Sequence, residues 1–438
     1  MRGSLLPLGA LILAACSSDD AATTPVDGGT TNGDGTVVTD GTTNDPDVQK
    51  PPESCLGTNF LTSLGKNHVL VGGTMQDATA KLAPFELRYL YLSGGLSDGP
   101  TTCTSCVTCT AQGKACKNLN NPNGCPWWGC WQSDQNPPGD YVRGFVAKAK
   151  GDGQIPMFSY YQLLQSSGVK EGAPEVTTAA NDPTFMARYL ADWRTVLQAI
   201  GQDVALLHIE PDFWGYAEQA NADPHALPAA IASANPTDCA AQENSIAGMG
   251  RCMIAMTRKY APHALVSLHG SGWGTKVDVE YNTNPALDVV AEGKKLGTFL
   301  LGCGADQGDM LVIDVADRDA GFQASQGNTN AYWDATNAKL PHFHQGFAWM
   351  KSVAETVKLP IVLWQIPLGN MSLPNQTDAW HDNRLDYFFA HMDEVAAAHI
   401  AGIAYGGGNP GCTSAETDNG NFIAKMKAYS VAPQKLCP

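Results

Sequence analysis

The sequence predicts a TIM-like parallel α/β barrel of seven or eight strands, and three observations support this prediction. Short apolar runs recur along the chain, and each ends in glycine or in a polar cluster. Because the runs are apolar on both faces, they suit parallel strands that are covered by helices. Stretches with helical apolar spacing separate the runs, and such alternation indicates a parallel α/β fold.

The order of the expected strands fits a barrel. They span residues 68–71, 87–92, 155–161, 204–209, 264–268, 310–315, 361–364 and 400–404. Helical stretches are expected between them, for example at 185–200, 246–259, 344–357 and 383–399. The first connection is short for a crossover helix, so a distorted barrel of seven strands is the alternative.

The first 16 residues have the features of an export signal. A single basic residue precedes an apolar run from Leu5 to Leu13, and small residues lead to Cys16. The segment resembles a bacterial lipoprotein signal, which implies that Cys16 is the lipidated N-terminus. An ordinary signal peptide that happens to carry a cysteine is the alternative. Ser17 is not the aspartate that marks retention in the inner membrane, so we expect an outer-membrane or surface location.

The next segment, residues 17–54, is predicted to be a disordered acidic linker. It consists mainly of Thr, Gly, Asp, Asn and Pro, and it cannot bury enough apolar surface to offset the entropy of ordering. Residues 55–438 form the predicted barrel domain, with a cysteine-rich insertion at about 95–150. The net charge of -16 disfavours binding to nucleic acid or to anionic membranes. We expect a monomer that contacts the membrane through its lipid alone.

Cysteines in an exported chain indicate disulfides. Twelve of the 13 cysteines remain once Cys16 is set aside, and six of these lie between residues 103 and 130. We expect them to staple a loop, with a metal knuckle as the alternative. Cys239 and Cys252 bracket a short segment and are expected to pair. The remaining partners stay open, with Cys303–Cys412 and Cys55–Cys437 as the working pairs.

The strand at 204–209 ends in carboxylates. The sequence continues Glu210-Pro211-Asp212-Phe213-Trp214. Strand alternation would place Glu210 and Asp212 on one face at the carboxyl end of the barrel, where enzymes of this fold keep their chemistry. Burial and mutual repulsion would raise the pKa of at least one of them, as a general acid at neutral pH requires.

A second acidic cluster follows the strand at 310–315. It contains Asp314, Asp317 and Asp319, with Arg318 available to pair with one of the last two. Asp314 ends its strand in phase with Val312. We expect one of these three carboxylates to serve as the catalytic base or nucleophile. The alternative is that Asp314 or Asp317 caps the next helix.

Aromatic and polar residues near other strand ends form the predicted sugar-binding set. Its members are Trp128, Trp214, His269, Trp273, Trp364, Gln365 and Tyr405. Trp128 lies in the cysteine-rich insertion, where such tryptophans either stack on sugars or form the core of the loop. Trp364 and Tyr405 are either sugar platforms or core aromatics. The last two strands end without a carboxylate, which argues against the large barrel class with glutamates after strands four and seven.

Two segments resemble the family 6 glycoside hydrolases, which are inverting cellobiohydrolases and endoglucanases. Glu210-Pro211-Asp212 is similar to the Glu-Pro-Asp motif of that family, and residues 269–273 look like its His-x-Gly-Trp segment with one residue added. The resemblance implies that Asp212 is the general acid. However, the Asp-Arg-Asp-Cys motif of the family has no counterpart at 158–162. A divergent relative or another barrel glycosidase is therefore expected.

The main functional hypothesis is a surface-anchored glycoside hydrolase that acts on a polysaccharide, for example a β-glucan such as cellulose. Asp212 would be the acid and Glu210 would tune it or hold the strand end. A non-catalytic glycan-binding lipoprotein is the alternative. Residues 269–273 do not match the Gly-x-Ser-x-Gly elbow of serine hydrolases. A metal-dependent hydrolase that uses His208 is disfavoured, because no tight zinc-binding spacing is present. Neither a metal nor a cofactor is expected.

Overall fold

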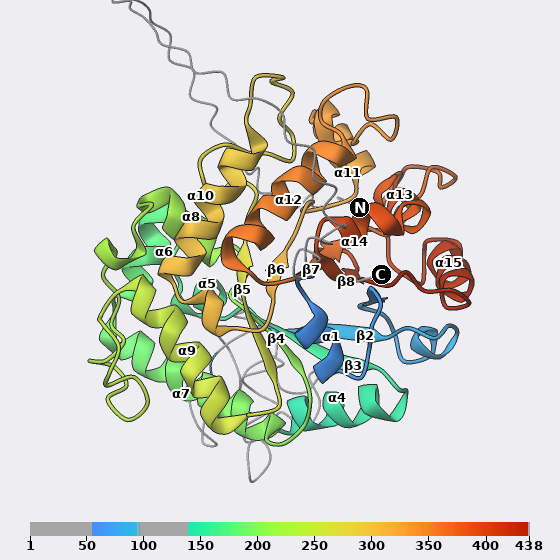
Figure 1. The fold of residues 1–438 in the computed structure, drawn as a ribbon. Coiled ribbons are helices and arrows are strands. Elements are labelled where there is room, and N and C mark those ends of the chain that lie inside the picture. The colour runs from blue at the N-terminus through green and yellow to red at the C-terminus, as the bar shows by residue number, and fades with distance from the viewer. Residues whose placement is uncertain (1–54, 94–95, 97–138, 437–438) are drawn as a thin grey trace, which may run out of the picture. The chain divides into compact units, whose positions relative to one another are not determined.

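The described chain forms a closed barrel of eight parallel strands (Figure 1). The computed structural model describes residues 55–93, 96 and 139–436. Contacts divide the chain into two units, Met1–Pro52 and Glu53–Pro438, and all described residues belong to the second. The barrel confirms the predicted fold class and decides for eight strands over seven. The predicted lipidation site at Cys16, Trp128 and most of the cysteine-rich insertion lie outside the described residues.

Each strand pairs with its neighbours in chain order, and β8 pairs with β1 to close the sheet. The strands are β1 Leu70–Gly73, β2 Leu87–Leu92, β3 Ile155–Tyr160, β4 Leu206–Ile209, β5 Leu265–Gly270, β6 Leu311–Ile313, β7 Ile361–Ile366 and β8 Ile400–Tyr405. Nearly every strand residue is buried, as expected for strands covered on both faces. The register of β7 against β8 shifts around Gln365, which has a positive φ of 59°. This irregularity carries β7 two residues beyond its predicted end.

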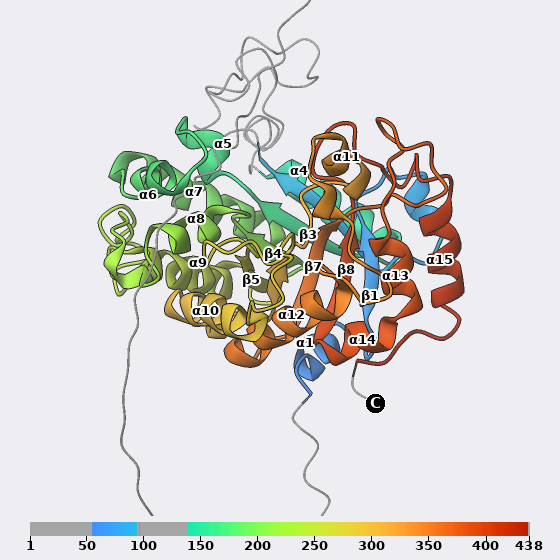
Figure 2. The same ribbon diagram turned by 90° about the horizontal axis from the view of Figure 1, so that it is seen from above.

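Helices surround the strands (Figure 2). They are α1 Thr58–Ser63, α4 Asp140–Gly151, α5 Leu163–Ser167, α6 Ala173–Ala180, α7 Pro183–Ile200, α8 Phe213–Ala220, α9 Ile246–Tyr260, α10 Val289–Gly302, α11 Ala320–Ser325, α12 Phe343–Val357, α13 Arg384–Ala390, α14 Met392–Ala397 and α15 Asn421–Tyr429. Short 3₁₀ helices lie at η1 Thr79–Lys81, η2 Pro224–Ala226, η3 Ala305–Gln307 and η4 Thr329–Ala331. The predicted single helix at 383–399 is wrong. It is two helices, because the backbone leaves the helical region at His391, with φ -130° and ψ 44°.

The long helices begin at residues that satisfy their first backbone amides. Asp182 accepts hydrogen bonds from the amides of Thr184 and Phe185 at the start of α7, and Pro183 occupies the first turn. Ser245 caps α9 in the same manner through the amide of Gly248. Their apolar faces are buried against the barrel. No helix of the described residues is long and apolar enough to cross a membrane.

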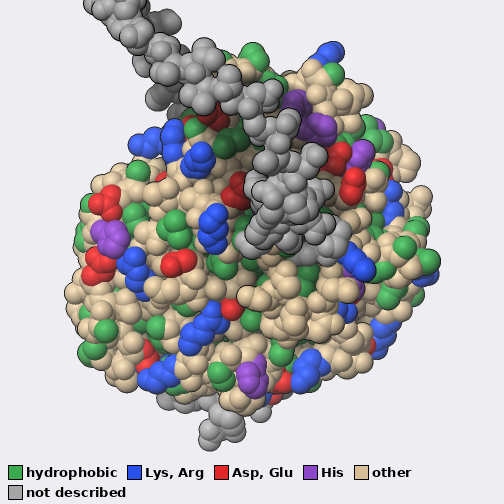
Figure 3. Space-filling model, viewed as in Figure 1, with side chains coloured by type: hydrophobic (Ala, Val, Ile, Leu, Met, Phe, Trp, Pro, Cys, Tyr) green, Lys and Arg blue, Asp and Glu red, His purple; other side chains and the backbone are tan. Residues whose placement is uncertain are grey.

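On the face seen in Figure 3, the basic and acidic side chains of the described residues are interspersed. They form no continuous patch of one sign among the described residues of this face.

The cysteines of the described residues settle two of the predicted pairs. Cys239 and Cys252 form a disulfide with a Cα–Cα distance of 5.4 Å, as predicted. The pair Cys303–Cys412 is wrong, because both thiols are free. Cys303 follows the end of α10, at the amino end of the barrel, whereas Cys412 lies in the loop after β8 at the carboxyl end. Cys55 is disulfide-bonded, and its predicted partner at position 437 lies outside the described residues.

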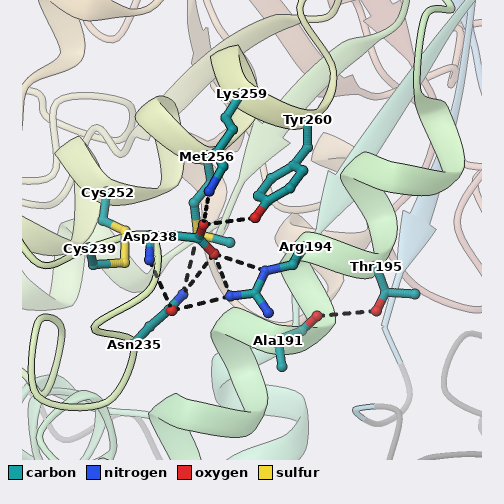
Figure 4. Close-up of polar contacts among 10 residues, drawn as sticks. All are labelled: Ala191, Arg194, Thr195, Asn235, Asp238, Cys239, Cys252, Met256, Lys259 and Tyr260. Carbon is teal, nitrogen blue, oxygen red and sulfur yellow. Dashed lines mark hydrogen bonds and ion pairs between the residues drawn. A yellow bond between two sulfur atoms is a disulfide. The ribbon is translucent and has the colours of Figure 1, made fainter.

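A buried carboxylate ties α7 to α9 beside the Cys239–Cys252 disulfide (Figure 4). Asp238 accepts hydrogen bonds from Arg194 Nε at 2.8 Å, Lys259 Nζ at 2.7 Å and Tyr260 Oη at 2.8 Å. Its side chain is only 1% exposed. Burial alone would raise the pKa of Asp238, but these hydrogen bonds hold it well below its usual range.

We expect Asp238→Asn to lower the free energy of unfolding at pH 7 by about 1–3 kcal/mol, because it removes a charge that several donors share. Since the pKa is depressed in the folded state, this stabilisation is present at neutral pH and fades as the pH falls below about 4. Urea denaturation at several pH values measures both effects. Asp203→Asn is the matched control, because Asp203 pairs with Lys150 at the surface and should contribute less than about 1 kcal/mol. Equal losses in the two variants would contradict the prediction.

Candidate active site

Asp212 lies at the junction of β4 and α8, where the backbone is unusual. Glu210 has φ 50° and Asp212 has φ 66°, which are left-handed conformations that few non-glycine residues adopt. This geometry ends the strand alternation at Ile209. Glu210 and Asp212 therefore do not share a face, which corrects the expectation from the sequence. Positive φ values at two such residues mark strain of the kind often found at functional sites.

The carboxyl group of Asp212 has few partners. Its Oδ2 accepts a hydrogen bond from Tyr161 Oη at 3.1 Å, and its side chain does not cap α8. Burial and then the carboxylate of Asp314 raise the pKa of Asp212 to about 7, against the opposing influence of His269. Asp212 is therefore an acid that still holds a proton near neutral pH, as general acid catalysis requires.

Asp314 comes directly after β6 and is the second carboxylate of the candidate site. Its Oδ1 lies 3.2 Å from Nε2 of His269, although the two atoms are not aligned as a formed hydrogen bond. Its Oδ2 has no hydrogen-bond partner among the described residues, and the side chain is 14% exposed. Because Asp314 is the largest charge acting on Asp212, the two predicted catalytic aspartates lie close enough to interact.

Glu210 points away from these two aspartates. Its Oε1 accepts hydrogen bonds from the backbone amides of Gln162 and Leu163, both at 3.0 Å, and from Tyr189 Oη at 2.9 Å. It is fully buried, and burial raises its pKa to about 8. These contacts join the end of β4 to the loop after β3 and to α7. They match the alternative in which Glu210 holds the strand end.

The other two predicted carboxylates differ in exposure. Asp317 is exposed, with Arg318 at 3.7 Å. Asp319 is 1% exposed and accepts hydrogen bonds from the amides of Gly369 and Thr413, both at 3.0 Å. Burial, with a contribution from Asp382, raises its pKa to about 7. Asp319 thus joins the loops after β6, β7 and β8, and both of its oxygens are occupied by backbone.

Several residues of the predicted sugar-binding set are buried, which corrects that prediction. Trp214 is fully buried and donates its indole hydrogen bond to the carbonyl of Ile209. Tyr405 is fully buried against Phe389 and Phe422 in the wall behind β8. These two positions leave no ring face for a sugar, because neighbouring side chains cover both.

Three further members of the set are also buried. Trp364 is 3% exposed and packs edge-on against His208 and His269, with ring centroids 4.7 and 5.9 Å away. His269 is completely buried, so it reaches a ligand only through Asp314. Gln365 is 6% exposed, and its amide accepts a hydrogen bond from Tyr91 and donates one to the carbonyl of Asp317.

Trp273 keeps a partly exposed ring. It lies against Tyr216 of α8 with ring centroids 4.7 Å apart, and the Tyr216 hydroxyl donates to Glu171 at 2.8 Å. Glu171 and Tyr216 also lie close enough to Asp212 to interact with it electrically. The Trp273–Tyr216 pair is therefore a partly exposed aromatic surface near the acid, and rings of this kind can stack on a sugar.

Several residues of the site were not found from the sequence. Tyr161, Tyr216 and Glu171 come from loops and helices whose position depends on the tertiary fold. Glu280 is 6% exposed, and burial together with Asp278 and Asp314 raises its pKa well above the usual range. The sequence signal for Glu280 is the glycine-rich stretch before it. The side chain of Glu280 packs directly against Gly272, where a Cβ atom would collide with it.

No group of three or more His, Cys, Asp or Glu side chains in the described ranges is arranged to hold a metal ion.

No protein-family model matches the chain, and no curated protein matches it. Solved structures do resemble it. The endo-β-1,4-mannanase from Thermotoga petrophila is 11% identical with a TM-score of 0.44, over 84% of this chain and 77% of that one. Endo-glycoceramidase II from Rhodococcus sp. is 12% identical with a TM-score of 0.44, over 82% and 78%.

The endoglucanase Cel6 from Mycobacterium tuberculosis is more distant, at 11% identity and a TM-score of 0.27, over 51% of this chain and 55% of that one. Likenesses this distant say nothing about activity, so the function has to be inferred from the side chains of the site.

We expect Asp319→Asn to lower the free energy of unfolding by about 1–3 kcal/mol, because one end of the amide would present a donor to a backbone N–H. Asp317→Asn is the matched control on the same loop. It should change stability by less than about 0.5 kcal/mol, since Asp317 is exposed. Chemical denaturation measures both variants. A stable Asp319→Asn protein would show that Asp319 does not hold these loops together.

Proposed function

We propose that this protein is a glycoside hydrolase in which Asp212 is the general acid and Asp314 is the base or nucleophile. One observation carries the proposal. A carboxyl group with a pKa of about 7 lies beside a second carboxylate at the carboxyl end of a parallel barrel. Two carboxyl groups with different environments are the minimum that glycosidic hydrolysis requires.

In this mechanism Asp212 donates its proton to the leaving glycosidic oxygen as the bond to the anomeric carbon breaks. Tyr161, which donates to Oδ2 of Asp212, orients the carboxyl group. The free Oδ2 of Asp314 either takes a proton from the attacking water or attacks the anomeric carbon itself. The first route inverts the configuration and the second retains it, so the anomer of the product identifies the role of Asp314.

The substrate that we propose is a polysaccharide, and a β-glucan such as cellulose is the first to test. The support is the resemblance of Glu210-Pro211-Asp212 to the family 6 motif, together with the Trp273–Tyr216 surface beside the acid. We further propose that the enzyme is exported and anchored to the outer membrane or cell surface through a lipid on Cys16. The support is the pattern of residues 1–16 and the linker-like composition of residues 17–54.

We expect Asp212→Asn to lower kcat on unactivated glycans by about 10²–10⁴-fold, because the leaving oxygen loses its proton donor. In the wild type, kcat/KM should fall as the pH rises through about 7, because Asp212 is active only while protonated. This alkaline limb should be absent from the variant. Initial rates on β-1,4-glucan, β-1,4-mannan and 4-nitrophenyl glycosides measure both effects.

The same panel decides between an enzyme and a binder. Retention on glycan affinity gels without release of any product would refute hydrolysis and support the non-catalytic glycan-binding lipoprotein. Full activity of Asp212→Asn would refute the assignment of the acid.

Glu210→Gln tests which residue of the motif is the acid. Glutamine keeps a carbonyl oxygen for the amides of Gln162 and Leu163, so we expect kcat within about fivefold of the wild type, with some loss of stability. The alkaline limb of the pH profile should remain. If this variant lost as much activity as Asp212→Asn while remaining folded, Glu210 would be the better candidate for the acid.

A further inference from the structure

Four polar side chains form a line through the interior of the barrel. Ser159 Oγ lies 3.1 Å from Nδ1 of His208, and Nε2 of His208 lies 3.0 Å from Nδ1 of His269. The other nitrogen of His269 then faces Asp314 at 3.2 Å. Ser159 and both histidines are completely buried, so no water competes for these contacts.

The register of the barrel explains why these residues meet. They come from four neighbouring strands: one residue each from β3, β4 and β5, and the residue directly after β6. Ser159 pairs with His208, His208 pairs with Ser267, and His269 pairs with Val312. His269 is two residues beyond Ser267 and Asp314 is two residues beyond Val312, so each stays on the inward face. The line therefore climbs towards the carboxyl end of the barrel, where Asp314 is reached.

When both imidazole rings are neutral, only one direction of hydrogen bonding suits an ionised Asp314. If His208 donated to Ser159, then His269 would have to donate to His208 and would face the carboxylate with a lone pair. In the opposite direction Ser159 donates to His208, His208 donates to His269, and the Nε2–H of His269 faces Asp314. Burial and the neighbouring His269 lower the pKa of His208 well below its usual range, which keeps that ring neutral as this direction requires.

We propose that Ser159 and His208 are positioning residues that fix the tautomer of His269, so that its Nε2–H holds Oδ1 of Asp314 and leaves Oδ2 to react. This inference rests on the proposed function. Trp364 packs against both imidazole rings and restricts their rotation. The contact to Asp314 is not yet aligned as a hydrogen bond, and such contacts often tighten only when substrate is bound.

The nearest comparison within the barrel is Ser267. Its hydroxyl is also completely buried and Ser267 is the cross-strand neighbour of His208, but the hydroxyl donates to the carbonyl of Leu207 at 3.0 Å and not to either histidine. Ser267→Ala thus removes a buried hydroxyl from β5 without breaking a hydrogen bond of the line, and it is a matched control for Ser159→Ala.

The kinetic test compares four variants of the full chain on the best substrate of the glycan panel. We expect His208→Leu to lower kcat by about tenfold or more with KM within about twofold, because His269 loses the donor that fixes its tautomer and its orientation towards Asp314. His208→Gln keeps a donor towards His269 and should stay within about threefold of the wild type. Ser159→Ala should lower kcat by about threefold to tenfold, and Ser267→Ala by less than about twofold.

The spectroscopic test records long-range proton–nitrogen correlations of ¹⁵N-labelled histidine. We expect His269 to carry its proton on Nε2 in the wild type and in His208→Gln, and to shift towards Nδ1 in Ser159→Ala. A proton on Nδ1 of His269 in the wild type would overturn the proposal, as would equal kcat losses in Ser159→Ala and Ser267→Ala. If His208→Leu does not fold, the other three variants still decide. If the wild type hydrolyses no glycan, the proposed function fails, and the tautomers alone decide whether this line of residues exists.

Discussion

Pairing of β8 with β1 closes the sheet, and the position of every residue of the candidate site depends on this closure. In an open sheet, β4 and β7 would lie far apart. In the barrel, Trp364 of β7 packs against His208 of β4 across the interior. The first strand permits the closure because Gly72 and Gly73 have no side chains. A Cβ atom at either position would collide with the carbonyl oxygen of Leu87 or Tyr405 on the neighbouring strands.

Buried carboxylates in this barrel fall into two groups that differ in their hydrogen bonds. Asp238 and Asp319 accept hydrogen bonds on both oxygens, and Glu210 accepts three on Oε1 while its buried Oε2 has none; all three join separate segments of the chain. Asp212 and Asp314 have one near partner apiece and lie where a ligand could reach them. A carboxylate whose oxygens are already occupied can stabilise the fold but cannot readily exchange a proton with a substrate. This difference separates the structural acids from the candidate catalytic ones more clearly than their pKa values do, since burial raises the pKa of Glu210, Asp319 and Asp212 alike.

The backbone conformation at the strand ends decides which way the side chains of the candidate site point. Glu210, Asp212 and Gln365 all adopt positive φ values where β4 and β7 end. At β4 this turns Glu210 outward, towards α7, and leaves Asp212 as the residue that faces Asp314. At β7 it directs Gln365 towards Tyr91 and the loop after β6. Strain of this kind persists only where the surrounding contacts hold it, and the three amide and phenol donors around Glu210 supply such contacts.

The sequence by itself determined the architecture and the position of the acids along the chain. Apolar runs located all eight strands because a strand covered on both faces must be apolar throughout. The rule that chemistry gathers at the carboxyl ends of barrel strands then pointed to Glu210 and Asp212 and to the three aspartates at 314–319, and the family 6 resemblance singled out Asp212. Only the tertiary structure decided which way each side chain points. The inward–outward alternation of strand residues could not anticipate the positive φ at Glu210. The hydrophobicity of Trp214 and Tyr405 could not show whether these side chains are buried or stack on a sugar. The line from Ser159 to Asp314 likewise depends on the register between four strands. Register is set by how the whole sheet closes, which is a property of long-range packing that no local stretch of sequence contains.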